Sequence, residues 1–337
     1  MRTPRPRARG SILALFLGAV LALTGCGSST EQSATEQPAA PASGQFPVTI
    51  ATAFGDVTVP EQPKRVVALG WGDAEVALTL GVQPVGASDW LPVGGDGVAP
   101  WMPQDKHYTT APTMLGTLEV SAEQVAALNP DLILDTRASG DKARYDQLAA
   151  LGVPVLSIPA GGEAYATTWQ QQLDMIGKAL GRTTEAETVK NDLEAKFQQA
   201  ADTHPEFKGK TVAVGSKTSG SYGAYVNGGS RIEFMERLGF IQSPQVQALA
   251  DDSFSVTVSP ERMDLFDADL TVMSPIGVSA DEITNDPLFQ AVPSVKAGHV
   301  VVFSDKMISL AFASATPLGL SYAIDKVLPM VTEAMAR

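Results

Sequence analysis

Aromatic and cationic side chains recur in loops of this 337-residue chain that follow short apolar runs. Aromatic faces offer apolar contact area, and guanidinium and ammonium groups attract anionic oxygens. Such a set is suited to binding a large, partly apolar, oxygen-rich ligand. The candidate binding residues are Trp71, Trp90, Arg137, Lys217, Tyr222, Tyr225, Arg231 and Met307.

Each candidate also has an interpretation without a ligand. Trp71 and Trp90 could be ordinary packing residues, and Arg137 could be a solvated loop arginine. Arg231 could pair with nearby acids such as Glu233. Tyr222 lies in a loop rich in Gly and Ser that offers little to pack against, which favours a binding role.

Side chains typical of catalysis or metal binding form no recognisable motif. No G-x-S-x-G, H-E-x-x-H or P-loop pattern occurs. His107, His204 and His299 are far apart and lack the spacing of metal ligands. We therefore expect no enzyme activity, no protein-bound metal and no resident cofactor. A hydrolase using two of the many carboxylates stays an alternative.

The single cysteine, Cys26, follows an apolar run that is too short to span a bilayer and is preceded by four arginines. The tetrapeptide 23–26 (LTGC) resembles the bacterial lipobox, which implies cleavage after residue 25 and lipidation of Cys26. Two acyl chains give lasting membrane attachment. We therefore predict a signal peptide over 1–25 and an anchor outside the cytoplasmic membrane. The alternative is an ordinary signal peptide with a chance cysteine.

Composition limits the partners that the chain could bind. Residues 27–44 contain no aromatic or large aliphatic side chain, so 26–45 is predicted to be a flexible tether. The net charge is −13, and removing the basic leader makes the remainder more acidic still. Binding to nucleic acid is thereby disfavoured. An anionic ligand would need a local cluster of Arg or Lys. We expect a monomer.

From residue 45 onward, predicted strands alternate with predicted helices, which indicates two doubly wound α/β lobes. The lobes are predicted over 46–165 and 183–337. The helical periodicity of 169–180 places an interlobe helix at 166–182. Ligands of such sheets bind beyond the carboxyl ends of the strands, which selects the loops named above.

An internal repeat relates the two halves. Residues 120–134 match 258–272 at a constant offset of 138. Ser121 and Ser259 would each cap a helix, and Glu123 and Glu261 would each lie in its first turn. The acids could simply complement the helix dipoles. They could also present one carboxylate per lobe to a roughly two-fold partner.

The chain resembles the substrate-binding lipoproteins of ABC importers for ferric siderophores, haem and vitamin B12, the class with a rigid interlobe helix. The resemblance extends from about residue 48 to 330. It depends on the order of the segments 55–60 (GDVTVP), 63–69 (PKRVVAL), 81–86 (GVQPVG), 123–134 and 295–300 (VKAGHV).

This resemblance implies that the ligand binds in the cleft between the lobes. It also implies that Glu123 and Glu261 pair with arginines of an ABC transporter permease. Aromatics with a few cations suit a ferric siderophore, whose iron arrives already chelated. The expected function is therefore iron-siderophore transport, with a haem- or cobalamin-binding protein of the same class as the alternative.

Overall fold

The computed structural model describes residues 45–251 and 253–337. These residues belong to one compact unit. The predicted signal peptide, Cys26 and almost the whole predicted tether lie outside the described residues. Within the described ranges, no helix combines the length and the apolar character that crossing a bilayer requires.

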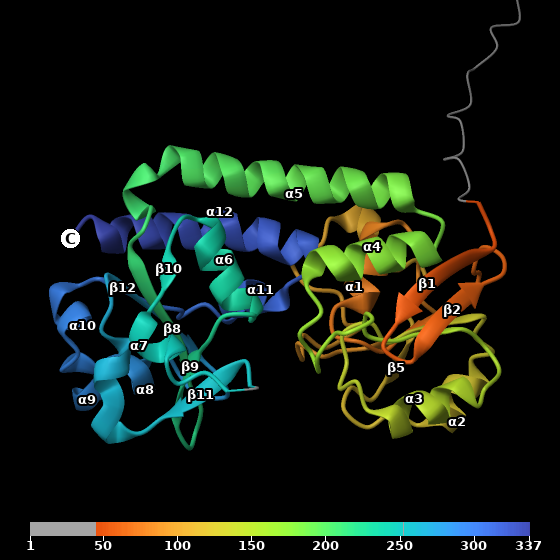
Figure 1. The fold of residues 1–337 in the computed structure, drawn as a ribbon, viewed down its shortest axis with the longest axis horizontal. Coiled ribbons are helices and arrows are strands. Elements are labelled where there is room, and N and C mark those ends of the chain that lie inside the picture. Colours follow the sequence, from red (N-terminus) through yellow and green to blue (C-terminus); the bar gives the residue numbers. More distant parts are fainter. Residues whose placement is uncertain (1–44, 252) are drawn as a thin grey trace, which may run out of the picture. The chain divides into compact units, whose positions relative to one another are not determined.

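The N-terminal lobe contains five parallel strands in the order β5-β4-β3-β6-β7 (Figure 1). The strands are short, and those in the middle of the sheet are fully buried, which is typical of a parallel sheet covered on both faces. A hairpin precedes the sheet. The elements are β1 (Val48–Thr52), β2 (Gly55–Val59), β3 (Val66–Ala68), α1 (Asp73–Thr79), β4 (Gly86–Ser88), η1 (Gln104–Lys106), β5 (Thr113–Leu115), α2 (Ala122–Ala127), β6 (Leu132–Leu134), α3 (Lys142–Ala149) and β7 (Val155–Leu156).

The C-terminal lobe has a mixed sheet in the order β11-β9-β8-β12-β13, with β10 beside β8. Strands β10 and β12 each pair with β8 in parallel, and β13 pairs with β12 in parallel. Strand β9 pairs with β8 in antiparallel orientation, and β11 pairs with β9 in the same way. The elements are β8 (Thr211–Lys217), β9 (Tyr222–Tyr225), α6 (Ser230–Arg237), β10 (Ile241–Gln242), α7 (Pro244–Gln247), β11 (Ser255–Val258), η3 (Pro260–Phe266), β12 (Leu270–Pro275), α8 (Asp281–Thr284), α9 (Pro287–Gln290), α10 (Pro293–Ala297), β13 (Val300–Val302), α11 (Lys306–Ser314) and α12 (Pro317–Met335).

The helix that reaches both lobes is α5 (Thr183–Thr203), not the predicted segment 166–182 (Figure 1). That segment contains α4 (Trp169–Ala179), which packs on α1 and β1 of the N-terminal lobe. Helix α5 begins beside α4 and ends in the C-terminal lobe, where Phe197 lies edge-on to Phe234 of α6. An apolar stripe shows that a helix is amphipathic but not which surface it covers, so the sequence pattern did not distinguish α4 from α5 as the helix between the lobes.

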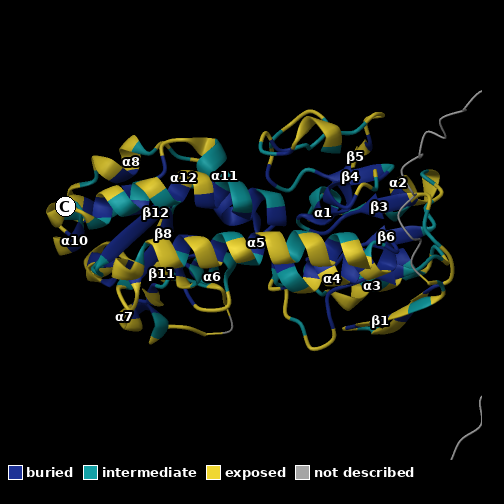
Figure 2. Cartoon of the chain, turned by 90° about the horizontal axis from the view of Figure 1, so that it is seen from above, coloured by how far each residue is buried: buried dark blue, intermediate teal, exposed yellow. Residues whose placement is uncertain are grey.

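One cluster of buried side chains runs through both lobes. It includes Val66 and Leu132 of the first sheet, Val212 and Leu270 of the second, and residues of α4, α5 and α12 between them. In Figure 2 the central strands of both sheets are buried, while the outer face of α5 is exposed. Separate clusters cover the other face of each sheet. The lobes are therefore joined by a shared core as well as by the chain.

The internal repeat corresponds to equivalent elements. Residues 120–134 include α2 and β6, and residues 258–272 include η3 and the first half of β12. Ser121 caps α2 by accepting a hydrogen bond from the backbone N–H of Gln124, as predicted. Ser259 makes no side-chain cap, and the turn after it is a 3-10 segment, interrupted by non-helical backbone at Arg262. The predicted α-helix is wrong there, although both segments lead into a parallel strand.

Candidate functional site

The cleft begins where the strand order of the N-terminal sheet reverses. Strand β3 lies between β4 and β6, so the loops after β3 and β6 leave the sheet in opposite directions. Such a switch point leaves a crevice beyond the carboxyl ends of the strands. Trp71 follows β3 and Arg137 follows β6, and the N–H of Trp71 donates to the carbonyl oxygen of Arg137 at 2.8 Å. The sequence rule therefore placed both residues at the same edge.

A buried carboxylate fixes these two loops. Asp73 accepts hydrogen bonds from the N–H of Gly70 at 2.9 Å and from the N–H of Thr136 at 3.0 Å. The Thr136 hydroxyl and the side-chain amide of Gln172 in α4 donate to the same carboxylate. Burial raises the pKa of Asp73 to about 6, although the hydrogen bonds oppose this. Asp73 thus positions the cleft loops without being one of the residues that line the cleft.

Three aromatic rings form the N-terminal wall of the cleft. The Trp71 and Trp90 rings stack with centroids 4.9 Å apart and an interplanar angle of 11°. Tyr165 lies on Trp71 with a centroid distance of 4.3 Å. Trp71 Nε1 is buried and has no hydrogen-bond partner among the described residues. The wall therefore combines apolar area with a donor that a ligand could use.

Arg137 crosses the cleft floor. Its Nη1 donates to the carbonyl oxygen of Ser314 at 3.0 Å, and its Nε donates to that of Tyr165 at 3.2 Å. The side chain is only 7% exposed, and burial together with the charge of Arg231 lowers its pKa to about 10. It remains charged at neutral pH, because its pKa is still well above 7.

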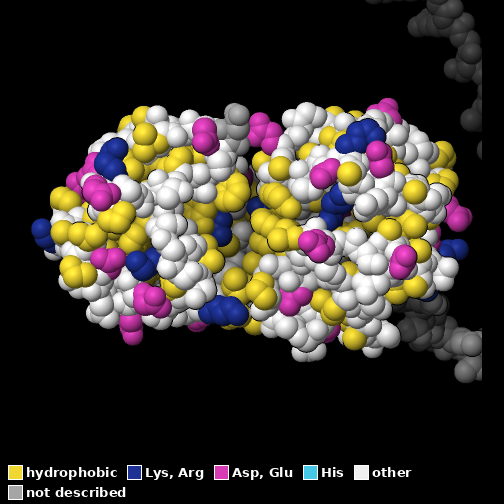
Figure 3. All heavy atoms as spheres, turned by 90° about the horizontal axis from the view of Figure 1, so that it is seen from below, with side chains coloured by type: hydrophobic (Ala, Val, Ile, Leu, Met, Phe, Trp, Pro, Cys, Tyr) yellow, Lys and Arg dark blue, Asp and Glu magenta, His cyan; other side chains and the backbone are white. Residues whose placement is uncertain are grey.

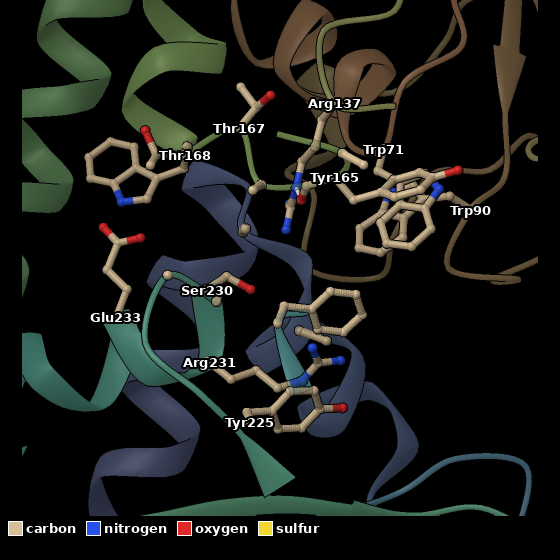
Figure 4. A pocket seen from close by; sticks show the side chains of 18 residues that line it. Trp71, Trp90, Arg137, Tyr165, Thr167, Thr168, Tyr225, Ser230, Arg231 and Glu233 are labelled. Carbon is tan, nitrogen blue, oxygen red and sulfur yellow. Dashed lines mark hydrogen bonds between the residues drawn. The ribbon is translucent and has the colours of Figure 1, made fainter. Parts of the chain in front are cut away.

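The C-terminal wall is formed by α6 and β9. Arg231 lies over the Tyr225 ring at 4.4 Å, which holds the guanidinium beside the cleft. Figure 4 shows Arg137 and Arg231 extending from opposite lobes toward the space between them. Glu233 also lines this pocket, and one of its oxygens accepts from the Gln170 side chain at 3.2 Å.

A larger pocket of about 850 Å³ continues from this floor on the far side of Trp90 and Arg231. It lies between the loop 90–92, the loop after β12 and the inner face of α11. Pockets of this size hold small-molecule ligands. Seen from below in Figure 3, a groove with hydrophobic and a few cationic side chains separates the two halves of the surface. The residues that line the larger pocket include Leu91, Pro92, Ile276, Val278, Ser279, Asp281, Lys306, Ser309 and Ala313.

Of the eight predicted binding residues, the structure brings five together around the cleft and leaves three elsewhere. Trp71, Trp90, Arg137, Tyr225 and Arg231 line the first pocket. The remaining three, which line neither of these two pockets, are Lys217, Tyr222 and Met307.

Tyr222 and Lys217 contact each other away from the cleft. The Tyr222 hydroxyl donates to Asp286 at 2.8 Å, and Lys217 pairs with the same carboxylate at 3.2 Å. Tyr222 packs on Phe266 and Phe289, because residues three apart in a strand face opposite sides of the sheet and Tyr225 takes the cleft side. Tyr222 therefore lies outside both cleft pockets, and the binding role assigned to it stays a prediction.

Met307 lies outside the larger pocket because of the helical periodicity of α11. Residues 306, 309, 310 and 313 of α11 line the larger pocket, and they recur at helical spacing. Met307 lies off this face, next to Asp305, which caps the helix through the Met307 N–H. Lys306 takes the position at the cleft that was assigned to Met307.

Two groups of cleft residues were missed. Tyr165 follows β7, and the loop 276–281 follows β12, so both lie beyond carboxyl ends of strands. The rule that selected Trp71 would also have selected them. Tyr165 has a φ of +57°, which sequence patterns do not reveal for a tyrosine.

The two repeat acids are exposed on opposite lobes. Glu123 lies in the first turn of α2 and Glu261 in the first turn of η3. In Figure 1, α2 and the strand β11 that leads into η3 both lie at the lower side, and α5 at the upper side. The histidines lie apart, and residues 45–251 and 253–337 contain no group of three His, Cys, Asp or Glu that could hold a metal.

Comparison with known proteins gives consistent matches. Residues 66–306 match the family model described as periplasmic binding protein. The probable siderophore-binding lipoprotein YfiY of Bacillus subtilis is 27% identical over 304 residues, covering 86% of this chain and 88% of that protein. A periplasmic solute binding protein from Mycobacterium smegmatis superposes with a TM-score of 0.73 at 25% identity, covering 86% and 98% of the two chains. Streptococcus pneumoniae PiaA in complex with ferrichrome gives 0.71 at 26% identity, covering 86% and 99%. The predicted two-lobed α/β fold class is confirmed.

Proposed function

The chain belongs to the periplasmic binding protein family, and we propose that it captures a ferric siderophore outside the cytoplasmic membrane and delivers it to an ABC permease. The observation that carries this proposal is a cleft in which two guanidinium groups from opposite lobes face a wall of stacked aromatic rings. One guanidinium about 5 Å from a unit negative charge gains roughly 3 kcal/mol at an effective dielectric near 20, before desolvation. The siderophore-binding relatives support this choice of ligand.

The test is a binding panel with the chain from residue 26, carrying Cys26→Ser. Ferric siderophores, haem and cobalamin are each titrated while Trp fluorescence is recorded, and bound iron is counted by equilibrium dialysis. We expect saturable quenching at one chelate per protein, because Trp71 and Trp90 line the cleft. The released ligand should be chemically unchanged. Binding of haem or cobalamin alone would favour the alternative within the family, and ligand turnover would favour an enzyme.

The proposal includes attachment to the membrane through Cys26. The apolar run, the tetrapeptide 23–26 and the lipoprotein relative support it. The intact mass of the protein purified from membranes provides the test. A chain that begins at Cys26 with acyl groups is expected, and an unmodified Cys26 would contradict the anchor.

The proposal also assigns Glu123 and Glu261 to permease docking. Their exposure and their matching positions in the repeat support this role. In Figure 1, α2 and the strand β11 that precedes η3 lie on the same, lower side. Charge pairs at such an interface chiefly set register and association rate.

A further inference from the structure

The cleft contains buried hydrogen-bond donors that lack acceptors. Trp71 Nε1 and Arg231 Nε are both buried without a partner among the described residues. Neither atom can accept a hydrogen bond, so only an oxygen-rich ligand or water could satisfy them. Ser274 Oγ, from a residue that lines the larger pocket, is also buried without a partner. Since most buried polar groups in proteins are paired, three such atoms around one cleft indicate where a ligand binds.

The inner cleft also contains two guanidinium groups that come from opposite lobes. Arg137 and Arg231 form no ion pair with any described carboxylate, and both hydrogen bonds of Arg137 go to neutral carbonyl oxygens. The two guanidinium groups repel each other, and this repulsion is one of the causes that lower the pKa of Arg137. An anion between them would relieve this repulsion.

The acids near the cleft do not pair with these two guanidinium groups. The charges of Asp73 and Glu233 both raise the pKa of Arg137, but neither carboxylate forms an ion pair with it. The Asp73 carboxylate accepts hydrogen bonds from Gly70, Thr136 and Gln172, and one oxygen of Glu233 accepts from Gln170. Figure 4 shows Glu233 on the side of Thr168, away from the labelled rings of Trp71, Trp90 and Tyr165. Lys306 and Asp281 lie exposed at the rim of the larger pocket and offset each other.

We propose that the cleft selects ferric chelates with net negative charge, whose iron is held by catecholate or carboxylate oxygens, over neutral or cationic hydroxamate chelates. The inference rests on the proposed function and narrows its ligand class. Anionic phenolate or carboxylate oxygens satisfy donors that cannot accept, and they fit between the two guanidinium groups. A catecholate ring can in addition stack on the aromatic wall.

Three iron chelates of different charge test the inference in the same chain. The probes are ferric enterobactin, an anionic tricatecholate, ferrichrome, a neutral trihydroxamate, and ferrioxamine B, a cationic trihydroxamate, with ferric citrate as an anionic probe without rings. We expect Kd to be lowest for the anionic chelates and to rise with added NaCl for these alone. Tighter binding of ferric enterobactin than of ferric citrate would show that the rings contribute.

Substitutions of single cationic residues test which side chains cause the preference for anionic chelates. Arg231→Gln removes one charge from a residue that makes no ion pair with a described carboxylate, and it should weaken binding of the anionic chelate about tenfold and of ferrichrome less than about threefold. Lys326→Gln, on the exposed face of α12, removes the same charge outside the cleft and should change neither. Arg137→Gln should act like Arg231→Gln, with melting temperature checked because Arg137 is buried.

The outcomes separate the two proposals. Equal or tighter binding of ferrichrome or ferrioxamine B overturns the charge selectivity and leaves siderophore binding intact. The same conclusion follows if Arg231→Gln weakens all chelates alike. Binding of none of the probes overturns the proposed function and this inference together.

Discussion

Asp73 shows how one residue outside the binding surface can position it. Its carboxylate joins the loop after β3, the loop after β6 and helix α4, and all three contribute to or adjoin the cleft. Burial raises its pKa, so the folded protein binds a proton there at higher pH than the unfolded chain does. The folded state is therefore stabilised by this group at low pH, and that contribution is lost as pH rises from about 4 to about 6.

We predict that Asp73→Asn removes this dependence. Between pH 4 and pH 6 the unfolding free energy of the wild type should fall by about 2 kcal/mol relative to the variant. Urea unfolding at several pH values gives this difference, and carbon NMR of the Asp73 carboxyl gives its pKa directly. A carboxyl that titrates below pH 4, or parallel pH curves for the two proteins, would contradict the prediction.

For single residues, the rule that ligands bind beyond the carboxyl ends of strands selected loops that line the cleft. It could not predict toward which side of a strand or helix each side chain points. Trp71 and Arg137 were found because they follow adjacent parallel strands. Tyr222 and Tyr225 could not be told apart, because the antiparallel pairing of β8 with β9 was not foreseen and the face of each side chain follows from that pairing. The rule would also have selected Tyr165, but neither its left-handed backbone conformation nor its contact with Trp71 could be predicted from the sequence.

At the scale of elements, the internal repeat reflects one structural solution used twice. Asp131 accepts hydrogen bonds from the N–H groups of Lys64 and Arg65, both at 2.8 Å, just before β3. Asp269 accepts from the N–H and hydroxyl of Thr211 at the start of β8, also at 2.8 Å. Each aspartate thus fixes the start of the strand next to its own. The N–H of Thr211 is the main cause that lowers the pKa of Asp269.

We predict that Asp131→Ala lowers the unfolding free energy by about 2 kcal/mol, because two backbone donors lose a charged acceptor. Asp146→Ala is the matched control. Its carboxylate is exposed and forms only an i,i+4 pair with Lys142, so the loss should stay within about 0.5 kcal/mol. Equal losses in the two variants by chemical denaturation would show that the repeated aspartate has no special role.

Most of the alternation of strands and helices in the N-terminal lobe could be predicted, because short apolar runs there end at a helix start or a turn. Strand β5 was missed. The helical stretch between the lobes could not be divided correctly. Both α4 and α5 are amphipathic, and tertiary contacts such as the packing of Phe197 against Phe234 show that α5 continues into the second lobe. The antiparallel strands β9 and β11 were missed because they are short and rich in polar residues or Gly.

At the scale of the molecule, docking to the permease should be separable from ligand binding. We predict that Glu123→Arg and Glu261→Arg each reduce uptake of radiolabelled ferric siderophore by cells about tenfold, because like charges then oppose each other at the interface. Chelate affinity of the purified variants should be unchanged, since neither residue lines the cleft pockets.

Glu187→Arg provides the control, because Glu187 is exposed on α5 at the opposite side of the molecule. It makes the same change of charge and should leave uptake at the wild-type level. Loss of uptake in all three variants would point to an effect of total charge. Loss of chelate affinity in the Glu123 or Glu261 variants would refute a role confined to docking.

The buried cluster that includes strands of both sheets has a consequence for how the protein denatures. Neither half can melt alone without exposing apolar side chains of the other to water, so heating should disrupt both in a single cooperative step. A chelate held between the halves would then raise the melting temperature of the whole unit. The cargo would thereby protect its carrier from heat, and from proteases that cut unfolded chains.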